Sequence, residues 1–228
     1  KAACHLGISI VPVAKANIVI ASPGIPTTQF PSINAPIISE LDYAYLLCKH
    51  YIPDIPIIAV TGTNGKSTVT SLIAHLLSCS AVGNIGIPFI SIPFTDFSEP
   101  FICVEASSYQ LETSYYFQPD VAVILNIAED HLVRHGSMQN YCQQKQRLIQ
   151  LMNENQTVFY NASDSNIKSL LHHTRNKMKN ISLSVPTYSC LEFIAKKHNL
   201  TVQKFLDKWA IQEYSDYQRP TSAFKKLV

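Results

Sequence analysis

Residues 57–68 read Ile57-Ile58-Ala59-Val60-Thr61-Gly62-Thr63-Asn64-Gly65-Lys66-Ser67-Thr68, a β-branched run that passes into two glycines, a lysine and two hydroxyl residues. Apolar residues then recur at helical spacing, at Val69, Leu72, Ile73, Leu76 and Leu77. The pattern predicts a strand, a glycine-containing loop and a helix in succession.

This loop has the composition of a phosphate-binding site. Gly62 and Gly65 allow the backbone to turn its N–H groups inward, and the N-terminus of the following helix adds positive potential. Lys66 is then expected on the β- and γ-phosphates and Ser67 on Mg²⁺. The strict eight-residue P-loop pattern is not met, because Val60 occupies the position of its first glycine. The alternative is a glycine-containing turn with a solvated lysine, but the flanking strand and amphipathic helix favour phosphate binding.

The composition narrows the class of protein. The chain has 228 residues, enough for one or two domains, and its net charge of +2 with 15% charged residues predicts no nucleic-acid-binding surface. Six cysteines without a CxxC pair lie mostly in apolar runs, so we expect reduced thiols in a cytoplasmic protein. We expect no signal peptide and no membrane span, because no apolar run approaches about 18 residues.

Further apolar runs predict the remaining strands, at residues 17–21, 36–38, 101–104, 121–127 and 157–160. Strands that alternate with helices predict an α/β fold, a mostly parallel sheet with helices on both faces. Ligands of such sheets collect beyond the carboxyl ends of the strands. Glu105 and the pair Asp130-His131 follow two of these runs, so we expect them to lie beside the phosphate loop.

The segment 137–152 is predicted to be a helix, with Lys145 in the middle of its apolar stripe. Two interpretations of this lysine are open. Its stem could pack while its ammonium reaches water, or its charge could serve a functional site near the end of the preceding strand.

Five short motifs occur in series along the chain. They are Ser-Pro-Gly-Ile-Pro at 22–26, Thr-Gly-Thr-Asn-Gly-Lys-Ser-Thr at 61–68, Gly-Asn-Ile-Gly-Ile-Pro at 83–88, Glu-Ala-Ser-Ser-Tyr-Gln-Leu-Glu at 105–112, and Leu-Asn-Ile-Ala-Glu-Asp-His-Leu-Val-Arg-His-Gly-Ser at 125–137, with Tyr141 and Lys145 in the following helix. In this order and spacing, over residues 17–164, the sequence resembles the bacterial Mur ligases. The first, third and fourth motifs favour the branch of the family that adds D-glutamate.

The resemblance implies a domain organisation and a reaction. Residues 1–53 are expected to be the remainder of an N-terminal nucleotide-sugar-binding α/β domain, and 54–228 the P-loop-type central ATPase domain, with a divergent tail at 165–228 and no C-terminal domain. The implied enzyme is an ATP-dependent, amide-bond-forming ligase of peptidoglycan precursor synthesis. It joins D-glutamate to UDP-N-acetylmuramoyl-L-alanine through an acyl phosphate. We expect a cytoplasmic monomer with these small-molecule substrates and no nucleic-acid or membrane partner.

The resemblance also implies roles for individual residues. Catalytic roles fall to Lys66, His131 and Lys145. ATP binding falls to Gly62, Thr63, Asn64, Gly65, Lys66, Ser67 and Thr68. Substrate binding falls to Ser22, Asn84 and Ser107, and binding of two Mg²⁺ ions to Ser67, Glu105, His131 and Lys145, the last expected to be carbamylated.

Departures from the family pattern keep two alternatives open. The opening glycine-rich turn that holds uridine and the segment that contacts adenine are missing, and Ser163 replaces an acidic residue. A non-catalytic nucleotide-binding fragment or remnant is therefore one alternative. A sibling Mur ligase with another amino-acid substrate is the other. In the tail, short helices are predicted at 191–197 and 202–209, and the pair His172-His173 is predicted to lie at the surface.

Overall fold

The computed structural model describes residues 16–30, 32 and 34–171. Seven strands and six helices follow one another in this part of the chain, with 3₁₀ turns at Thr27–Gln29 and Phe89–Ser91. In chain order they are β1 (Val19–Ala21), β2 (Ile37–Ser39), α1 (Glu40–Tyr51), β3 (Ile57–Thr61), α2 (Lys66–Leu77), β4 (Ala81–Gly83), β5 (Ile102–Glu105), α3 (Ser108–Leu111), β6 (Val121–Ile124), α4 (Leu132–His135), α5 (Met138–Gln150), β7 (Thr157–Tyr160) and α6 (Ser165–Leu171).

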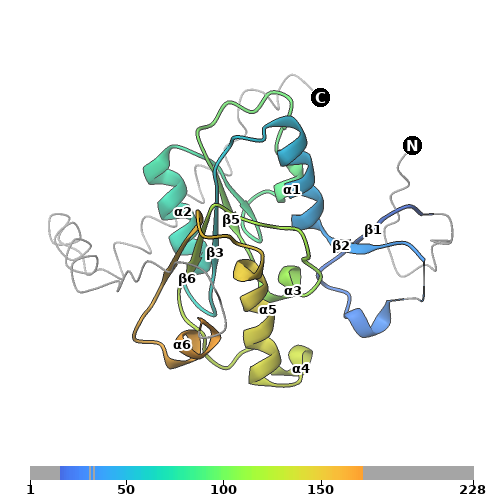
Figure 1. The fold of residues 1–228 in the computed structure, drawn as a ribbon, viewed down its shortest axis with the longest axis vertical. Helices are drawn as coiled ribbons and strands as arrows, with labels where there is room; N and C mark the ends of the chain where they lie inside the picture. Colours follow the sequence, from blue (N-terminus) through green and yellow to red (C-terminus); the bar gives the residue numbers. More distant parts are fainter. Residues whose placement is uncertain (1–15, 31, 33, 172–228) are drawn as a thin grey trace, which may run out of the picture. The chain divides into compact units, whose positions relative to one another are not determined.

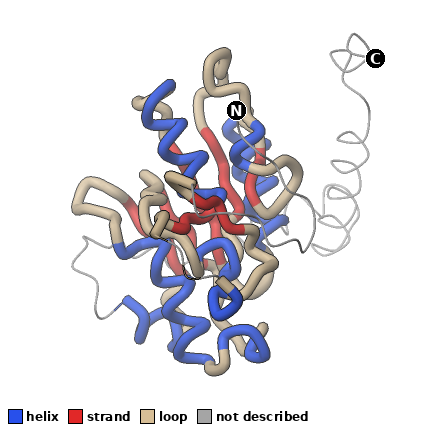
Figure 2. The backbone as a smooth tube through the Cα atoms, turned by 90° about the vertical axis from the view of Figure 1, so that its right-hand side faces the viewer, coloured by secondary structure: helices blue, strands red, loops and turns tan. Residues whose placement is uncertain are grey.

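The strands form two parallel sheets. β1 pairs with β2, and the other five strands form a sheet in the order β4-β5-β3-β6-β7 with all pairs parallel. β3 therefore lies at the centre, between β5 and β6. Figure 2 shows the strands in the middle of the described part of the chain with helices around them. The predicted α/β class is confirmed.

Side chains of the central strand alternate between two hydrophobic clusters. Ile57 and Ala59 of β3 belong to a large cluster with buried residues of α1, α5 and α6. Ile58 and Val60 belong to a second cluster in which α2 packs. Figure 1 shows α2 on one side of the sheet and α1 and α5 on the other. A strand buried on both faces reads as a continuous apolar run, which is what residues 57–60 are.

Helix α1 is held by polar contacts as well as by the core. Ser39 caps its N-terminus, with its Oγ accepting a hydrogen bond from Asp42 N at 3.0 Å. The fully buried Asp42 carboxylate accepts from Ser114 Oγ at 2.7 Å. It also accepts from three successive backbone N–H groups, those of residues 115–117, at 2.7–3.0 Å. One carboxylate therefore fixes α1 to the segment that follows α3.

The predicted elements differ from the observed ones mainly at their ends. The helix predicted at 137–152 is α5, and the strand predicted at 121–127 ends at Ile124 because the chain then turns into the site. The predicted tail helices and the pair His172-His173 lie outside the described residues.

Cys48 and Cys103 are buried, and burial raises the pKa of their thiols to about 11 and about 12.

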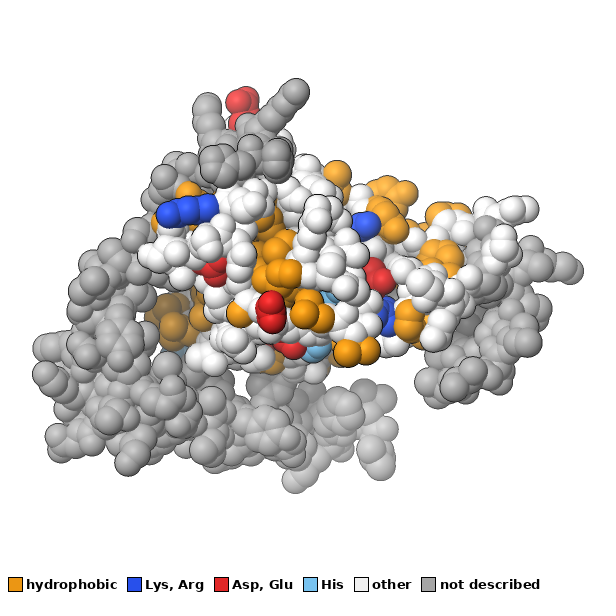
Figure 3. Space-filling view, turned by 90° about the horizontal axis from the view of Figure 1, so that it is seen from below, with side chains coloured by type: hydrophobic (Ala, Val, Ile, Leu, Met, Phe, Trp, Pro, Cys, Tyr) orange, Lys and Arg blue, Asp and Glu red, His pale blue; other side chains and the backbone are white. Residues whose placement is uncertain are grey.

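One face of the described part carries side chains of both charge signs. Figure 3 shows one face on which hydrophobic side chains lie singly or in small groups among acidic, basic and histidine side chains. None of the helices in residues 16–30, 32 and 34–171 is long and apolar enough to cross a membrane.

Candidate functional site

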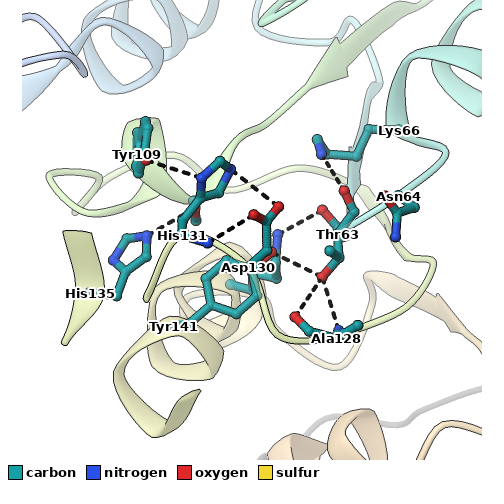
Figure 4. A network of polar contacts seen from close by, with 12 residues as sticks. Thr63, Asn64, Lys66, Tyr109, Ala128, Asp130, His131, His135 and Tyr141 are labelled. Atoms are coloured by element: carbon teal, nitrogen blue, oxygen red, sulfur yellow. Dashed lines mark hydrogen bonds and ion pairs between the residues drawn. The ribbon is translucent and has the colours of Figure 1, made fainter. Parts of the chain in front are cut away.

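The predicted site residues come together at the carboxyl ends of β3, β5 and β6. The register pairs Val60 with Glu105 and Thr61 with Ile124, so the loop after β3 lies between the ends of its two neighbours. Figure 4 shows the side chains from this loop and from the segment after β6 gathered around Thr63 and Asp130. The expectation that the phosphate loop, Glu105 and Asp130-His131 share one edge of the sheet is confirmed.

The phosphate loop is clamped by an asparagine from the end of β6. Asn126 Oδ1 accepts from Asn64 N at 2.8 Å, and Asn126 Nδ2 donates to Asn64 O at 3.0 Å. Its backbone carbonyl accepts from Thr63 N at 2.9 Å. Gly65 begins α2 with φ +82°, a left-handed conformation that glycine adopts at little cost. Contacts within the chain therefore hold the loop in this conformation.

Thr63 joins the loop to the next two elements. Its Oγ1 accepts from Ala128 N at 3.0 Å and lies 3.0 Å from the hydroxyl of Tyr141 on α5. Lys66 Nζ donates to Thr63 O at 2.9 Å and is only half-buried. Its ammonium thus rests on a loop carbonyl.

Lys145 is buried below the same loop. Its side chain is 1% exposed, its Nζ donates to Gly62 O at 2.7 Å, and it lies 4.7 Å from the centre of the Tyr141 ring. Burial, followed by the nearby positive charge of Lys66, lowers the pKa of Lys145 to about 7. Its ammonium does not reach water, so the snorkelling interpretation is wrong. Its predicted functional role stays a prediction.

Glu105 is a buried carboxylate with one oxygen unpaired. It is 1% exposed, and its Oε1 accepts from Asn84 Nδ2 at 2.7 Å. Its Oε2 is buried and has no hydrogen-bond partner. A methyl group on Gly83, which has φ +100°, would overlap the carbonyl oxygen of Glu105. The backbone of β4 thus approaches Glu105 as closely as a residue without Cβ allows.

His131 has an unusual backbone and two side-chain partners. Its φ of +53° places it in the left-handed region at the start of α4, which costs free energy for a residue with a Cβ. Its Nδ1 lies 3.1 Å from the hydroxyl of Tyr109 and its Nε2 lies 3.3 Å from Asp130 Oδ2. The imidazole is nearly half exposed, and both of its ring nitrogens have a partner within the chain.

The remaining predicted residues are found on the loops and helix starts described above. Ser107 caps α3 in a reciprocal pair with Gln110, and Ser22 Oγ accepts from Gly24 N at 3.4 Å. Ser67 is exposed in the first turn of α2, where Thr68 follows it. Their predicted contacts with substrate and metal stay predictions.

Sequence reasoning did not assign a role to Asn126, Tyr109 or Tyr141, although all three lie in the quoted motifs. The sequence did contain a signal for these roles. Asn126 lies at the end of one predicted strand, Tyr109 follows another, and Tyr141 lies on the helical stripe that carries Lys145. Within residues 16–30, 32 and 34–171, no three His, Cys, Asp or Glu side chains gather as a ready-made metal site.

A parallel sheet with a glycine-containing loop between its central strand and a helix is the arrangement of P-loop-type domains. The family model of the Mur ligase middle domain matches residues 60–219, which is most of the chain. The chain therefore belongs to the Mur ligase family, as its motifs predicted.

Several proteins of known function are similar to it. It is 39% identical over 150 residues to the UDP-N-acetylmuramoylalanine–D-glutamate ligase of Caldicellulosiruptor bescii, covering 61% of this chain and 32% of that protein. With the same ligase of Leptospira interrogans the identity is 46% over 152 residues, covering 62% and 31%. The chain spans about a third of the length of these curated relatives. A crystal structure of MurF from Acinetobacter baumannii aligns with a TM-score of 0.49 at 18% identity, covering 62% of this chain and 34% of that one.

Proposed function

We propose that this chain provides the ATP-binding and carboxylate-activating centre of a ligase that adds D-glutamate to UDP-N-acetylmuramoyl-L-alanine. The observation that carries the proposal is the convergence of Lys66, Lys145, Glu105 and His131 on one clamped phosphate loop. The two relatives described above, both ligases of this specificity, support the choice of substrate.

The proposed division into domains has mixed support. Residues 1–53 would belong to the nucleotide-sugar-binding domain and residues 54–228 to the central domain. The separate two-stranded sheet of β1 and β2 supports a division. Helix α1 lies within 1–53 but packs in the same core as β3, so the boundary passes through a shared hydrophobic cluster.

ATP would bind with its phosphates on the loop. Backbone N–H groups of the loop and the N-terminus of the 12-residue helix α2 supply fixed positive potential. Lys66 would leave Thr63 O for the β- and γ-phosphates, which are stronger acceptors than a carbonyl. Catalysis of phosphoryl transfer rests mainly on such positioning and charge neutralisation.

Magnesium fits the residues present. An unpaired buried carboxylate oxygen is costly, and the Oε2 atom of Glu105 would gain a partner from a cation. Glu105 and Ser67 would hold one ion and His131, with a modified Lys145, a second. The ions would supply neutralisation of the phosphate charges.

Lys145 is suited to carbamylation by carbon dioxide. A pKa of about 7 leaves a large neutral fraction near neutral pH, and only the neutral amine attacks. Attack of Nζ on carbon dioxide forms an N–C bond and releases a proton, which gives an anionic carbamate. The buried positive charge beside Lys66 would be replaced by a negative one that attracts it.

The reaction follows in two transfers. The alanyl carboxylate attacks the γ-phosphorus of ATP, so a P–O bond to the acyl group forms and the bond to ADP breaks. The D-glutamate amine then attacks the acyl carbon, loses a proton, and phosphate leaves as the C–N bond forms. Lys66 and the loop N–H groups hold the transferred phosphoryl group throughout.

Because ATP and nucleotide sugars are cytoplasmic metabolites, the same proposal places the protein in the cytoplasm, and we propose a monomer.

The test follows both products separately. The chain is incubated with ATP, Mg²⁺, UDP-N-acetylmuramoyl-L-alanine and D-glutamate, and ADP and the glutamate-containing product are measured, with Lys66→Ala as control. ADP release that needs the muramoyl substrate and is lost in Lys66→Ala supports the activation centre. Two results would contradict the activation centre and favour a nucleotide-binding remnant. One is ADP release that needs neither the muramoyl substrate nor Lys66, and the other is no ADP release at all.

A further inference from the structure

Arg134 on α4 holds a loop from a distant part of the sequence. Its Nη2 donates to Ile25 O at 2.9 Å and to Pro23 O at 3.4 Å, and its Nη1 donates to Gly24 O at 3.5 Å. The carbonyl groups of three successive residues thus meet one guanidinium. These residues belong to the segment 22–27, which follows β1 and contains the predicted substrate residue Ser22.

Glu112 completes this contact from the end of α3. Its Oε2 accepts from Arg134 Nε at 2.9 Å and from Nη2 at 2.8 Å. Its Oε1 accepts from Thr27 Oγ1 at 2.9 Å. The two side chains are only 13% and 15% exposed, so the pair is largely shielded from water. Two charge-assisted bonds from the guanidinium to one carboxylate oxygen fix geometry more firmly than a single neutral bond does.

The same arginine reaches the catalytic centre through one aromatic ring. The guanidinium carbon lies 5.2 Å from the centre of the Tyr109 ring, and the Tyr109 hydroxyl lies 3.1 Å from His131 Nδ1. The Tyr109 and His131 rings also pack at 4.8 Å between centres. The segment 22–27 and His131 are therefore connected by contacts through Arg134 and Tyr109.

We propose that Arg134 and Glu112 form a clasp that positions the segment 22–27 relative to His131. Arg134 is a positioning residue here, since it contacts the loop and the ring beside His131. The consequence for substrate rests on the proposed function. The clasp sets the distance between the segment that meets the sugar-nucleotide part and the residue that meets the carboxylate of the same molecule.

Two conservative variants test the clasp without removing much volume. Arg134→Lys keeps the charge but has no fork, and Glu112→Gln keeps the shape but loses the charge. Arg147→Lys is the matched control, because Arg147 packs 5.0 Å from the Tyr115 ring and touches no residue of the clasp. Circular dichroism and thermal unfolding verify that each variant is folded.

The first readout is amide hydrogen exchange over residues 22–27, which needs no substrate. In both clasp variants exchange should accelerate at least about tenfold, since the segment loses the contacts that keep it closed, and it should stay unchanged in Arg147→Lys. The second readout is calorimetry. Affinity for UDP-N-acetylmuramoyl-L-alanine should fall about tenfold in the clasp variants, while MgATP affinity stays within about twofold.

The two readouts separate the failure of the clasp from that of the proposed function. Unchanged exchange in both clasp variants overturns the clasp. Faster exchange combined with unchanged affinity for the muramoyl ligand supports the clasp but overturns the substrate role of the segment, and with it the proposed function of Ser22.

Discussion

Replacing Lys145 with methionine should make the folded chain more stable. Burial and the charge of Lys66 lower the pKa of Lys145 from 10.5 to about 7. At roughly 1.4 kcal/mol for each pKa unit, holding this ammonium in the folded chain costs roughly 5 kcal/mol. The lost bond to Gly62 O offsets about 1 kcal/mol of the gain. At pH 7.5 the folded amine is already mostly neutral, so only about 4 kcal/mol of this cost applies, and after the lost bond we expect about 3 kcal/mol of added stability for Lys145→Met.

The same linkage predicts a pH dependence with a defined sign. Between the folded pKa of about 7 and the unfolded value of 10.5, the unfolded chain holds nearly one more proton at this site. Stability should therefore rise with pH in this window, by about 1.4 kcal/mol for each pH unit, and the penalty should be complete below it. Lys145→Met should lack this contribution.

Urea unfolding in bicarbonate-free buffer between pH 7.5 and 9.5 measures both effects. Each is taken as a difference between Lys145→Met and the wild type, because both proteins contain the same cysteines and their contribution to the pH dependence then cancels. Lys168→Met is the matched control, because Lys168 is an exposed lysine on α6. A Lys145→Met protein that is less stable than wild type and has the same pH slope would refute the reasoning.

Three further outcomes are expected. In ¹³C-bicarbonate buffer, ¹³C NMR should show a carbamate signal that disappears on acidification and is missing from Lys145→Met; its absence from the wild type would contradict the proposed modification. Asp42→Ala should lower the unfolding free energy by about 3 kcal/mol, since four donors lose a buried charged acceptor, and an effect below about 1 kcal/mol in urea unfolding would contradict the anchor. Gly83→Ala should cost about 2–4 kcal/mol by the same method, because a Cβ at φ +100° overlaps Glu105 O, whereas a neutral effect would mean that β4 can shift.

The sequence predicted the class of fold because the periodicities were local. Residues 57–60 read as a doubly buried strand, and the stripe on 137–152 read as a helix, and both were observed. The site edge was predictable too, since parallel strands bring their carboxyl ends together, which placed Glu105 and His131 beside the loop.

The remaining features depend on contacts between residues far apart in the chain. The position of Lys145 in the apolar stripe could not show whether its ammonium reaches water. The burial of this side chain depends on the loop that covers it, where Gly62 O accepts a hydrogen bond from Nζ. The clamp by Asn126 and the buried Asp42 have no local signature, since asparagine and aspartate usually lie in exposed turns. Arg134 and Ile25 are 109 residues apart, and only the folded chain shows their bond.

Binding of MgATP to the wild type and to Lys66→Ala tests the central claim most directly. The Lys66 side chain is half-buried and its Nζ donates to Thr63 O, so alanine removes its charge with little effect on the core. Loss of one charge-assisted contact costs roughly 1.5–3 kcal/mol, so calorimetry should show MgATP affinity about 10- to 150-fold weaker, and Lys168→Ala should bind like wild type. Equal affinity in wild type and Lys66→Ala would contradict the assignment of residues 62–68 as the phosphate-binding loop.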